Sequence, residues 1–398
     1  MGQILVEEIR AAVLGAWRQI ITLPPTAGIN IGYVLLVASV FLICLVILIK
    51  RGDTAESASP VIPLSLGGLA ILLAGIPFWI TGIPVQLEFP WDRSSLPFMI
   101  GTSLLISGGV LLVRPILRNP AIALLIALST GMHYQNYVFY QIEWEKLNQF
   151  FWQMTWRAPG LEPGTILVSD EIPILYYGDN NLTPILNWIY DPDQQSKELA
   201  YNFFDLGERL GKNLPALEPD MPVSHGYRFL NFSSNSNFLL PVYFDSENCL
   251  KIIDDSMSNY EKIPNRLREI EAFANPYDLI QIQNHNTPPR FLPEPEHSWC
   301  YFYQKAGLAV QMKNWQEVED LFFLVKEQGL KPQDQTEWLP FIRGLAFSGN
   351  LENALEITQI GLHNEKAKPV ICSMWNNIAA TESLNPDVLE AYSQLECQ

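Results

Sequence analysis

The chain has 398 residues and a net charge of −17, and 48% of its residues are apolar. The charge is unevenly distributed: residues 1–140 hold seven Lys or Arg and six Asp or Glu, whereas residues 141–398 hold 18 and 36. The second part lacks the basic footprint of a nucleic-acid-binding surface, so that class of partner is excluded.

An amphipathic helix lying in a membrane interface is predicted within residues 1–30. Apolar residues recur at helical spacing through residues 3–22, with Glu7, Glu8 and Arg10 between them. Because this helix leads directly into an apolar segment, we also expect the chain to be the trailing part of a longer protein.

Residues 31–142 predict four transmembrane helices. A span needs about 20 apolar residues, and the runs that reach this length are 31–49, a stretch within 61–87, 94–113 and 119–142. Glycines inside these runs favour close helix packing. The alternative is a set of buried core helices, which four successive runs with short charged loops argue against.

Basic residues predict the orientation of the four helices. Lys50 and Arg51 follow the first run, and Arg114 and Arg118 follow the third. Short loops rich in Lys and Arg stay in the cytoplasm. The acidic part, which follows the fourth helix, is therefore predicted to be extracytoplasmic.

The loop between the second and third predicted helices carries Glu88, Asp92 and Arg93. On the extracytoplasmic face these residues could contact a ligand above a membrane cavity. The more ordinary interpretation is a local ion pair between Asp92 and Arg93 that anchors the third helix.

Residues 143–298 predict an extracytoplasmic α/β domain. A helix is expected to continue from the fourth span to Arg157, where a Pro- and Gly-rich segment stops it. Strands are predicted at 165–169, 227–232, 238–244 and 249–254, with the second and third forming a hairpin, and helices at 173–177, 182–190 and 197–210. The strands would form a small mixed sheet covered by helices.

Asp170 and Glu171 directly follow the first predicted strand. Open α/β sheets bind ligands at the carboxyl ends of their strands, so these carboxylates are candidate site residues. A helix cap or a solvated turn is the alternative.

Four of the five cysteines lie in the acidic part, and their spacing matches no zinc or redox motif. An extracytoplasmic location permits disulfides. Cys249 and Cys300 are the first candidate pair, with free buried thiols as the alternative.

Residues 299–398 predict a helical, tetratricopeptide-like region. Gly307-Leu308-Ala309 recurs 37 residues later as Gly344-Leu345-Ala346, and each copy precedes an Asn-containing turn and a second helix, at 315–327 and 351–362. Such units stack and bind protein partners in a groove. A plain helical cap is the alternative.

Catalytic and cofactor motifs are absent from the sequence. It contains no phosphate loop, dinucleotide fingerprint or nucleophile elbow, and no His pair at metal-binding spacing, so neither cofactor nor metal is predicted. His297, close to Glu294 and Glu296, is a further candidate site residue. A buried, hydrogen-bonded histidine at a helix entry is the more ordinary interpretation.

Two stretches resemble known families. The segment with Trp91, Asp92, Arg93, Leu96 and Pro97 before an apolar run resembles the stretch before a late transmembrane helix in lipid-linked (C-type) glycosyltransferases. Ser94 stands where those enzymes commonly carry an aromatic residue. Their essential carboxylates lie in an early extracytoplasmic loop that has no counterpart here.

The second resemblance covers roughly residues 85–350. The stretches 151–165 and 294–301 look like a bacterial family of large polytopic proteins with a glycosyltransferase-like membrane region, a family without a settled activity. This resemblance implies that the chain is the C-terminal part of such a protein and lacks its catalytic carboxylate.

The predicted fold class is therefore a membrane all-α region of four transmembrane helices, a soluble α/β domain and a C-terminal α-helical repeat-like region. The first functional hypothesis is an accessory, binding or split-protein role in the cell envelope, with membrane lipids and a protein partner at residues 299–398. The alternative is an enzyme that transfers sugar from a lipid-linked donor, with Glu88, Asp92 or the pair Asp170 and Glu171 as its base.

Overall fold

The computed structural model describes residues 10, 15, 18, 31–51, 59–83, 85, 87, 92–175, 178–257, 259–283, 286–382, 385–395 and 397. The chain forms two compact units, Met1–Trp144 and Glu145–Gln398, here named the apolar unit and the acidic unit. Glu88 and nearly all of the predicted amphipathic helix lie outside the described residues.

Among the described residues, four helices are long and apolar enough to cross a membrane. They are α3 (Ile31–Arg51), α4 (Val61–Thr81), the 3-10 helix η2 (Asp92–Phe98) continued by α5 (Met99–Leu112), and α6 (Pro115–Arg157). The four predicted helices are thus confirmed in length and composition. No residue of α3 is buried within the chain, although the helix is apolar on all sides.

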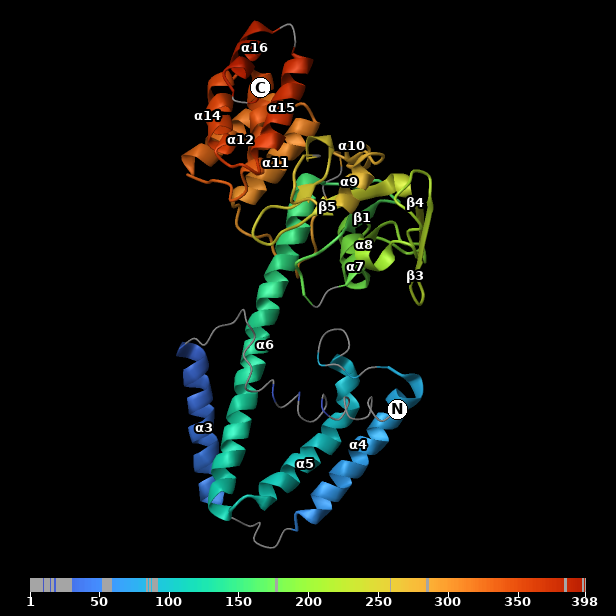
Figure 1. The fold of residues 1–398 in the computed structure, drawn as a ribbon, viewed down its shortest axis with the longest axis vertical. Helices are drawn as coiled ribbons and strands as arrows, with labels where there is room; N and C mark the ends of the chain where they lie inside the picture. The colour runs from blue at the N-terminus through green and yellow to red at the C-terminus, as the bar shows by residue number, and fades with distance from the viewer. Residues whose placement is uncertain are drawn as a thin grey trace. The chain divides into compact units, whose positions relative to one another are not determined.

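Glycines allow the helices of the apolar unit to pack closely. A Cβ atom on Gly67 of α4 would lie 2.8 Å from the carbonyl oxygen of Gly101 in α5. Where α3 and α6 lie side by side (Figure 1), a Cβ atom on Gly131 would lie 2.7 Å from Val37. Small residues therefore determine how near these backbones come.

Helix α6 extends from the apolar unit into the acidic unit as one continuous helix. Its last turns bury Phe150, Phe151 and Met154 in the core of the acidic unit. The helix ends at Arg157 because the following alanine precedes Pro159, which disfavours helical backbone there. The predicted extension of the fourth helix to Arg157 is confirmed.

The acidic unit contains a four-stranded mixed sheet in the order β2-β1-β5-β6. The strands are β1 (Ile166–Ser169), β2 (Asn202–Asp205), β5 (Leu239–Tyr243) and β6 (Lys251–Ile252). Strand β1 is parallel to β2 and β5, and β6 is antiparallel to β5. Helix α7 (Asp179–Tyr190) connects β1 to β2 and packs on β2.

The hairpin predicted at 227–232 and 238–244 is wrong. The actual hairpin pairs β3 (Pro222–Gly226) with β4 (Asn231–Asn235) through a turn closed by a hydrogen bond from the Tyr227 N–H to the Leu230 oxygen, at 2.7 Å. Strand β5 pairs with β1 instead. Its continuous apolar sequence is typical of an inner strand of a parallel sheet.

Two predicted helices are also wrong. Of the helix predicted at 197–210, only α8 (Leu206–Arg209) is helical, and Asn202–Asp205 form strand β2. The Asp205 carboxylate caps α8 by accepting the Gly207 N–H. Phe203 and Phe204 are both buried, so the strand is apolar on both faces and its sequence shows no alternation. Residues 173–175 of the predicted helix 173–177 are not helical, and the other two lie outside the described residues.

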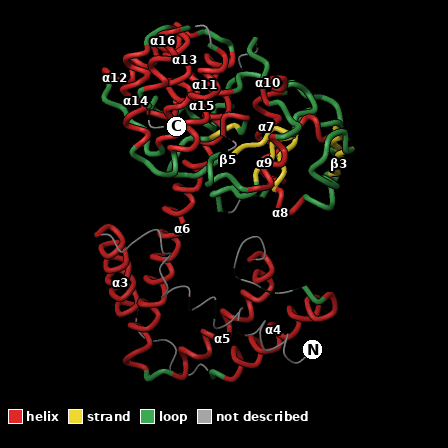
Figure 2. Tube along the Cα trace, turned by 45° about the horizontal axis from the view of Figure 1, so that its top comes forward, coloured by secondary structure: helices red, strands yellow, loops and turns green. Residues whose placement is uncertain are grey.

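Short helices complete the α/β part: η3 (Ser236–Phe238), η4 (Asp255–Met257), α9 (Asn265–Glu271) and α10 (Pro276–Leu279). Six longer helices and η5 (Gln335–Trp338) follow: α11 (Trp299–Gln311), α12 (Trp315–Glu327), α13 (Leu339–Ser348), α14 (Leu351–Leu362), α15 (Lys368–Thr381) and α16 (Pro386–Ser393). Figure 2 shows these helices gathered in one part of the acidic unit and the strands in another. The helices predicted at 315–327 and 351–362 are confirmed, and their N-caps are equivalent: the Asn314 and Asn350 side chains each accept an N–H three residues later.

The sheet and the C-terminal helices share one hydrophobic core. A disulfide between Cys249 and Cys300 joins the two parts covalently and confirms the predicted pair. A second disulfide, Cys372–Cys397, was not predicted; it links α15 to the segment after α16. Beside the first disulfide, the buried Lys251 ammonium lies 3.3 Å from carboxylates of both Asp334 and Glu337.

Candidate functional site

A groove runs along the first helices of three successive helix pairs. Helices α11, α13 and α15 pack in that order. Two adjoining cavities of about 520 and 300 Å³ open along them and share Arg343, Phe347 and Thr381. The other lining residues are Tyr277, Val310, Gln311, Lys313, Trp315 and Glu382 in the larger cavity, and Ser256, Met374, Asn377, Ile378 and Ala380 in the smaller one.

The charge of this groove differs from that of the surrounding unit. Residues 141–398 hold twice as many acidic as basic residues, 36 against 18. The lining residues nevertheless include Arg343 and Lys313 against a single carboxylate, Glu382. Arg343 is half-buried, and none of the hydrogen bonds or ion pairs between described residues involves its guanidinium group. The groove therefore offers a free, partly desolvated cation.

Aromatic side chains form the wall of the groove next to Arg343. The rings of Trp315 and Phe347 stack with their centroids 4.8 Å apart and their planes within 17°. Tyr277 donates its hydroxyl proton to Asp254 at 2.6 Å, and burial raises the pKa of Tyr277, so the hydroxyl stays protonated. A rigid aromatic wall beside a free cation suits an extended peptide with both apolar and acidic side chains.

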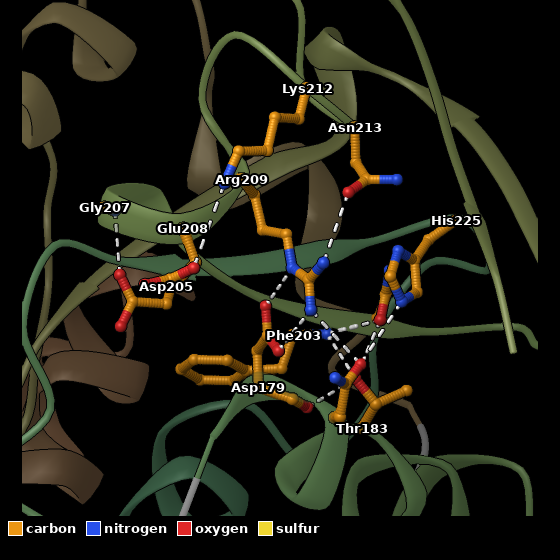
Figure 3. A network of polar contacts seen from close by, with 12 residues as sticks. Asp179, Thr183, Phe203, Asp205, Gly207, Glu208, Arg209, Lys212, Asn213 and His225 are labelled. Atoms are coloured by element: carbon orange, nitrogen blue, oxygen red, sulfur yellow. Dashed lines mark hydrogen bonds and ion pairs between the residues drawn. The ribbon is translucent and has the colours of Figure 1, made fainter. Parts of the chain in front are cut away.

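A second polar site joins α7, α8 and β3 (Figure 3). Arg209 binds Asp179, in the first turn of α7, through two hydrogen bonds: Nε to Oδ2 at 2.5 Å and Nη2 to Oδ1 at 2.8 Å. Its Nη1 donates to Asn213 at 3.3 Å. His225 Nε2 lies 3.2 Å from the side-chain oxygen of Asn180, which Arg209 also contacts.

The histidine of this network is held neutral. Burial and then the Arg209 charge lower the pKa of His225. Tyr227 packs edge-on against it at 4.4 Å and donates its hydroxyl to Asn202 at 2.8 Å. Burial also raises the pKa of Tyr227 to about 12. These contacts fix the β3–β4 hairpin to α7, which is a structural role.

Known proteins give no guide to what the groove or the network binds. Comparison of the chain with protein-family models, with curated proteins and with solved structures finds no match. Within the described residues, no group of three or more His, Cys, Asp or Glu side chains is arranged to hold a metal ion. The function is therefore inferred from the residues of this chain alone.

The structure places the predicted carboxylates at the end of β1 in a structural contact. Asp170 forms an ion pair with Arg266 at 3.0 Å. The backbone oxygen of Glu171 accepts the Ser169 hydroxyl at 2.8 Å. Asp170 is thus tied to a residue of α9, and neither carboxylate lines the groove.

His297 lies in an aromatic cluster. Its ring stacks on Tyr301, with centroids 3.6 Å apart. Its Nε2 lies 3.0 Å from Glu294, whose carboxylate also accepts the Trp156 N–H at 3.1 Å. The prediction of a hydrogen-bonded histidine at a helix entry is confirmed, but the ring is exposed rather than buried, because it covers the outside of the cluster.

The ion pair predicted between Asp92 and Arg93 is wrong: none of the ion pairs formed by described residues joins them. The Asp92 carboxylate instead accepts the backbone N–H of Arg93 at 2.9 Å, because Asp92 begins η2, where backbone N–H groups lack partners. Glu88, the third candidate of this loop, lies outside the described residues.

Sequence analysis missed the residues that make both sites. Arg343 had one available signal, as the only charged residue in the otherwise apolar helix α13. The residues of the second site, Asp179, Arg209 and His225, come from separate elements, and nothing in their spacing marks them.

Proposed function

We propose that the chain is a non-catalytic, membrane-anchored binding protein of the cell envelope. In this proposal the four apolar helices span the membrane, the acidic unit faces an extracytoplasmic compartment, and the groove holds a segment of a partner protein. The chain would act as an accessory subunit or as one half of a split protein.

The cysteines of the acidic unit support its proposed extracytoplasmic location. All four cysteines of this unit form disulfides, whereas the described free thiol, Cys44, belongs to α3. Disulfides persist in oxidising compartments and are rare in the cytosol. The same orientation is supported by Lys50 and Arg51 in the last turn of α3 and by Arg114 and Arg118 where α5 is followed by α6.

The observation that carries the binding function is the free guanidinium group of Arg343 beside the stacked rings of Trp315 and Phe347. Burying a cation without a partner is unfavourable unless a ligand supplies the missing charge. The expected ligand is an extended peptide that places a carboxylate on Arg343 and an apolar side chain on the aromatic wall.

A peptide-display selection on the full chain in nanodiscs tests this proposal. We expect the selected peptides to be rich in Asp or Glu. Arg343→Ala should weaken their binding by about 10-fold or more, the effect of losing one hydrogen-bonded charge pair. The matched control is Lys326→Ala, which removes an exposed cation that pairs with Glu356 outside the groove. Selection of no peptide, or equal binding to both variants, would overturn the proposal.

The alternative of a lipid-linked sugar transferase has less support. Within the acidic unit, Asp170 and His297 belong to separate structural contacts rather than to one site. Turnover of a lipid-linked sugar by the purified chain, lost on Asp170→Ala, would replace the binding proposal with this one.

A further inference from the structure

An aromatic patch lies on the acidic unit away from the groove. It consists of Trp188, Phe229, Leu230 and Phe291, whose exposed fractions are 54%, 82%, 37% and 47%. The rings of Trp188 and Phe291 meet edge-on with centroids 5.6 Å apart. Trp188 and Leu230 line the same small cavity of about 160 Å³, so side chains from three separate segments form one surface.

The most exposed member, Phe229, lies in the turn of the β3–β4 hairpin. The turn consists of residues 227–230, and Figure 1 shows the hairpin projecting at the edge of the acidic unit. Because 82% of Phe229 is exposed, burial of its ring contributes little to the stability of the unit. The hairpin thus presents apolar area outwards.

Two arginines are adjacent in the sequence to residues of the patch. Arg228 and Arg290 each precede a Phe-Leu pair, at Phe229 and Phe291. Both arginines are exposed, and none of the hydrogen bonds or ion pairs between described residues involves their side chains. The patch therefore combines aromatic rings with free cations in a unit that is otherwise strongly acidic.

We infer that the aromatic patch binds the headgroup region of a lipid bilayer. Aromatic rings partition into this region, and arginine pairs with lipid phosphate. The bilayer is the occupant that we favour, because the same chain carries four helices long and apolar enough to cross a membrane. This inference concerns a different surface from the groove. It rests on the proposed function only in that the four apolar helices span a membrane, which assembly of the chain into nanodiscs tests separately.

The two arginines also oppose the electrostatic repulsion between the acidic unit and an anionic membrane. An acidic unit is repelled by an anionic membrane surface. Arg228 and Arg290 supply a local attraction at the patch, which acts within about one Debye length of roughly 8 Å at physiological salt. Binding is therefore expected to depend on the two arginines when anionic lipids are present.

The test places an environment-sensitive fluorophore on Phe229→Cys in the full chain with Cys44→Ala. The protein is assembled at one chain per nanodisc in a mixture of phosphatidylcholine and phosphatidylglycerol, with and without a lipid that carries a nitroxide quencher near the headgroup. We expect at least a twofold loss of emission with the quencher. The matched control is Phe323→Cys on α12, which is 47% exposed and lies outside the patch; its emission should change little.

A double variant tests whether quenching at position 229 depends on the two arginines. Arg228→Glu with Arg290→Glu should restore most of the emission at position 229. Absence of quenching at this position, equal quenching at positions 229 and 323, or insensitivity to the double variant would each overturn the inference. Quenching that occurs in crowded proteoliposomes but not in single-chain nanodiscs would show that the patch meets a second copy, and would overturn it too.

Discussion

Glu337 is a buried carboxylate with three partners. Its Oε1 accepts the Cys249 N–H at 2.8 Å and lies 3.3 Å from Lys251 Nζ, and its Oε2 accepts the Trp299 ring N–H at 2.7 Å. Lys251 also faces Asp334. A single buried ammonium thus compensates two carboxylates where the sheet meets the C-terminal helices.

Lys251→Met should strongly destabilise the acidic unit. It leaves two buried carboxylates without their cation, and breaking such a pair costs about 3–5 kcal/mol. Lys262→Met is the matched control, because Lys262 is 3.8 Å from Asp334 but 36% exposed, and exposed pairs contribute about 0–1 kcal/mol. Denaturant unfolding of the full chain in detergent, followed by near-UV circular dichroism, measures both. If both variants lowered the free energy of unfolding equally, Lys251 would not be the cation that compensates the two buried carboxylates.

The same cluster predicts sensitivity to acid. Burial alone would raise the pKa of Asp334, but the Lys251 charge and hydrogen bonds from Tyr260 and Thr336 outweigh it and lower the pKa from 3.8 to about 2. A carboxyl group with a depressed folded pKa stabilises the fold above its unfolded pKa, and this stability is lost as the pH falls through the folded pKa.

Asp334→Asn should therefore flatten the fall in the free energy of unfolding between about pH 4 and pH 2, by about 2 kcal/mol. The pKa of Glu337 moves the opposite way, raised mainly by burial, so Glu337 is not the source of this acid loss. Unfolding curves of the two proteins at several pH values in detergent measure the effect. An unchanged slope would exclude Asp334 as the acid-sensitive group.

At the scale of elements, the contact between α4 and α5 depends on particular glycines. Gly67→Leu should separate these helices, because a Cβ atom there would lie 2.8 Å from the Gly101 carbonyl oxygen. Gly68→Leu is the control on the same helix, since a Cβ atom there meets nothing within 4 Å. We expect a loss of about 1–3 kcal/mol for the first variant only. Thermal unfolding in detergent, read by size-exclusion chromatography, compares them, and similar losses would contradict this packing.

Most helices were predicted from the sequence, but the pairing of the strands was not. Local spacing, turns and caps suffice to locate α12 and α14, because a helix satisfies its hydrogen bonds within itself. Strands β2 and β5 depend instead on β1, from which they are distant in the chain. Strand β5 was predicted as a strand but was given the wrong partner. Strand β2 was predicted as part of a helix, because its buried residues face both ways and show no alternation.

The groove was predictable only in outline. The repeated Gly-Leu-Ala segments and the Asn caps predicted paired helices and a partner-binding region at 299–398. Which side chains line the groove depends on how α11, α13 and α15 pack, and on Tyr277, which reaches it from α10. The period of a repeat does not specify how these helices pack, so it could not predict the residues that line the groove.

At the scale of the whole molecule, the two disulfides and the basic loops point to the same orientation. Cys249–Cys300 closes a sequence separation of 51 residues and Cys372–Cys397 one of 25. Loop-closure entropy assigns such links about 4 and 3.5 kcal/mol. In a reducing cytosol the acidic unit would lose both contributions.

The orientation can be tested by labelling single cysteines in intact cells. Ser59→Cys, between α3 and α4, and Ser233→Cys, in β4, are exposed positions in separate units, introduced together with Cys44→Ala. We expect a membrane-impermeant maleimide to label position 233 and not position 59 until the cells are permeabilised. The four cysteines of the acidic unit should resist alkylation unless a reductant is added. The inverse pattern, with label at position 59 and four reactive thiols, would put the acidic unit in the cytosol, where groove binding could continue but an extracytoplasmic role could not.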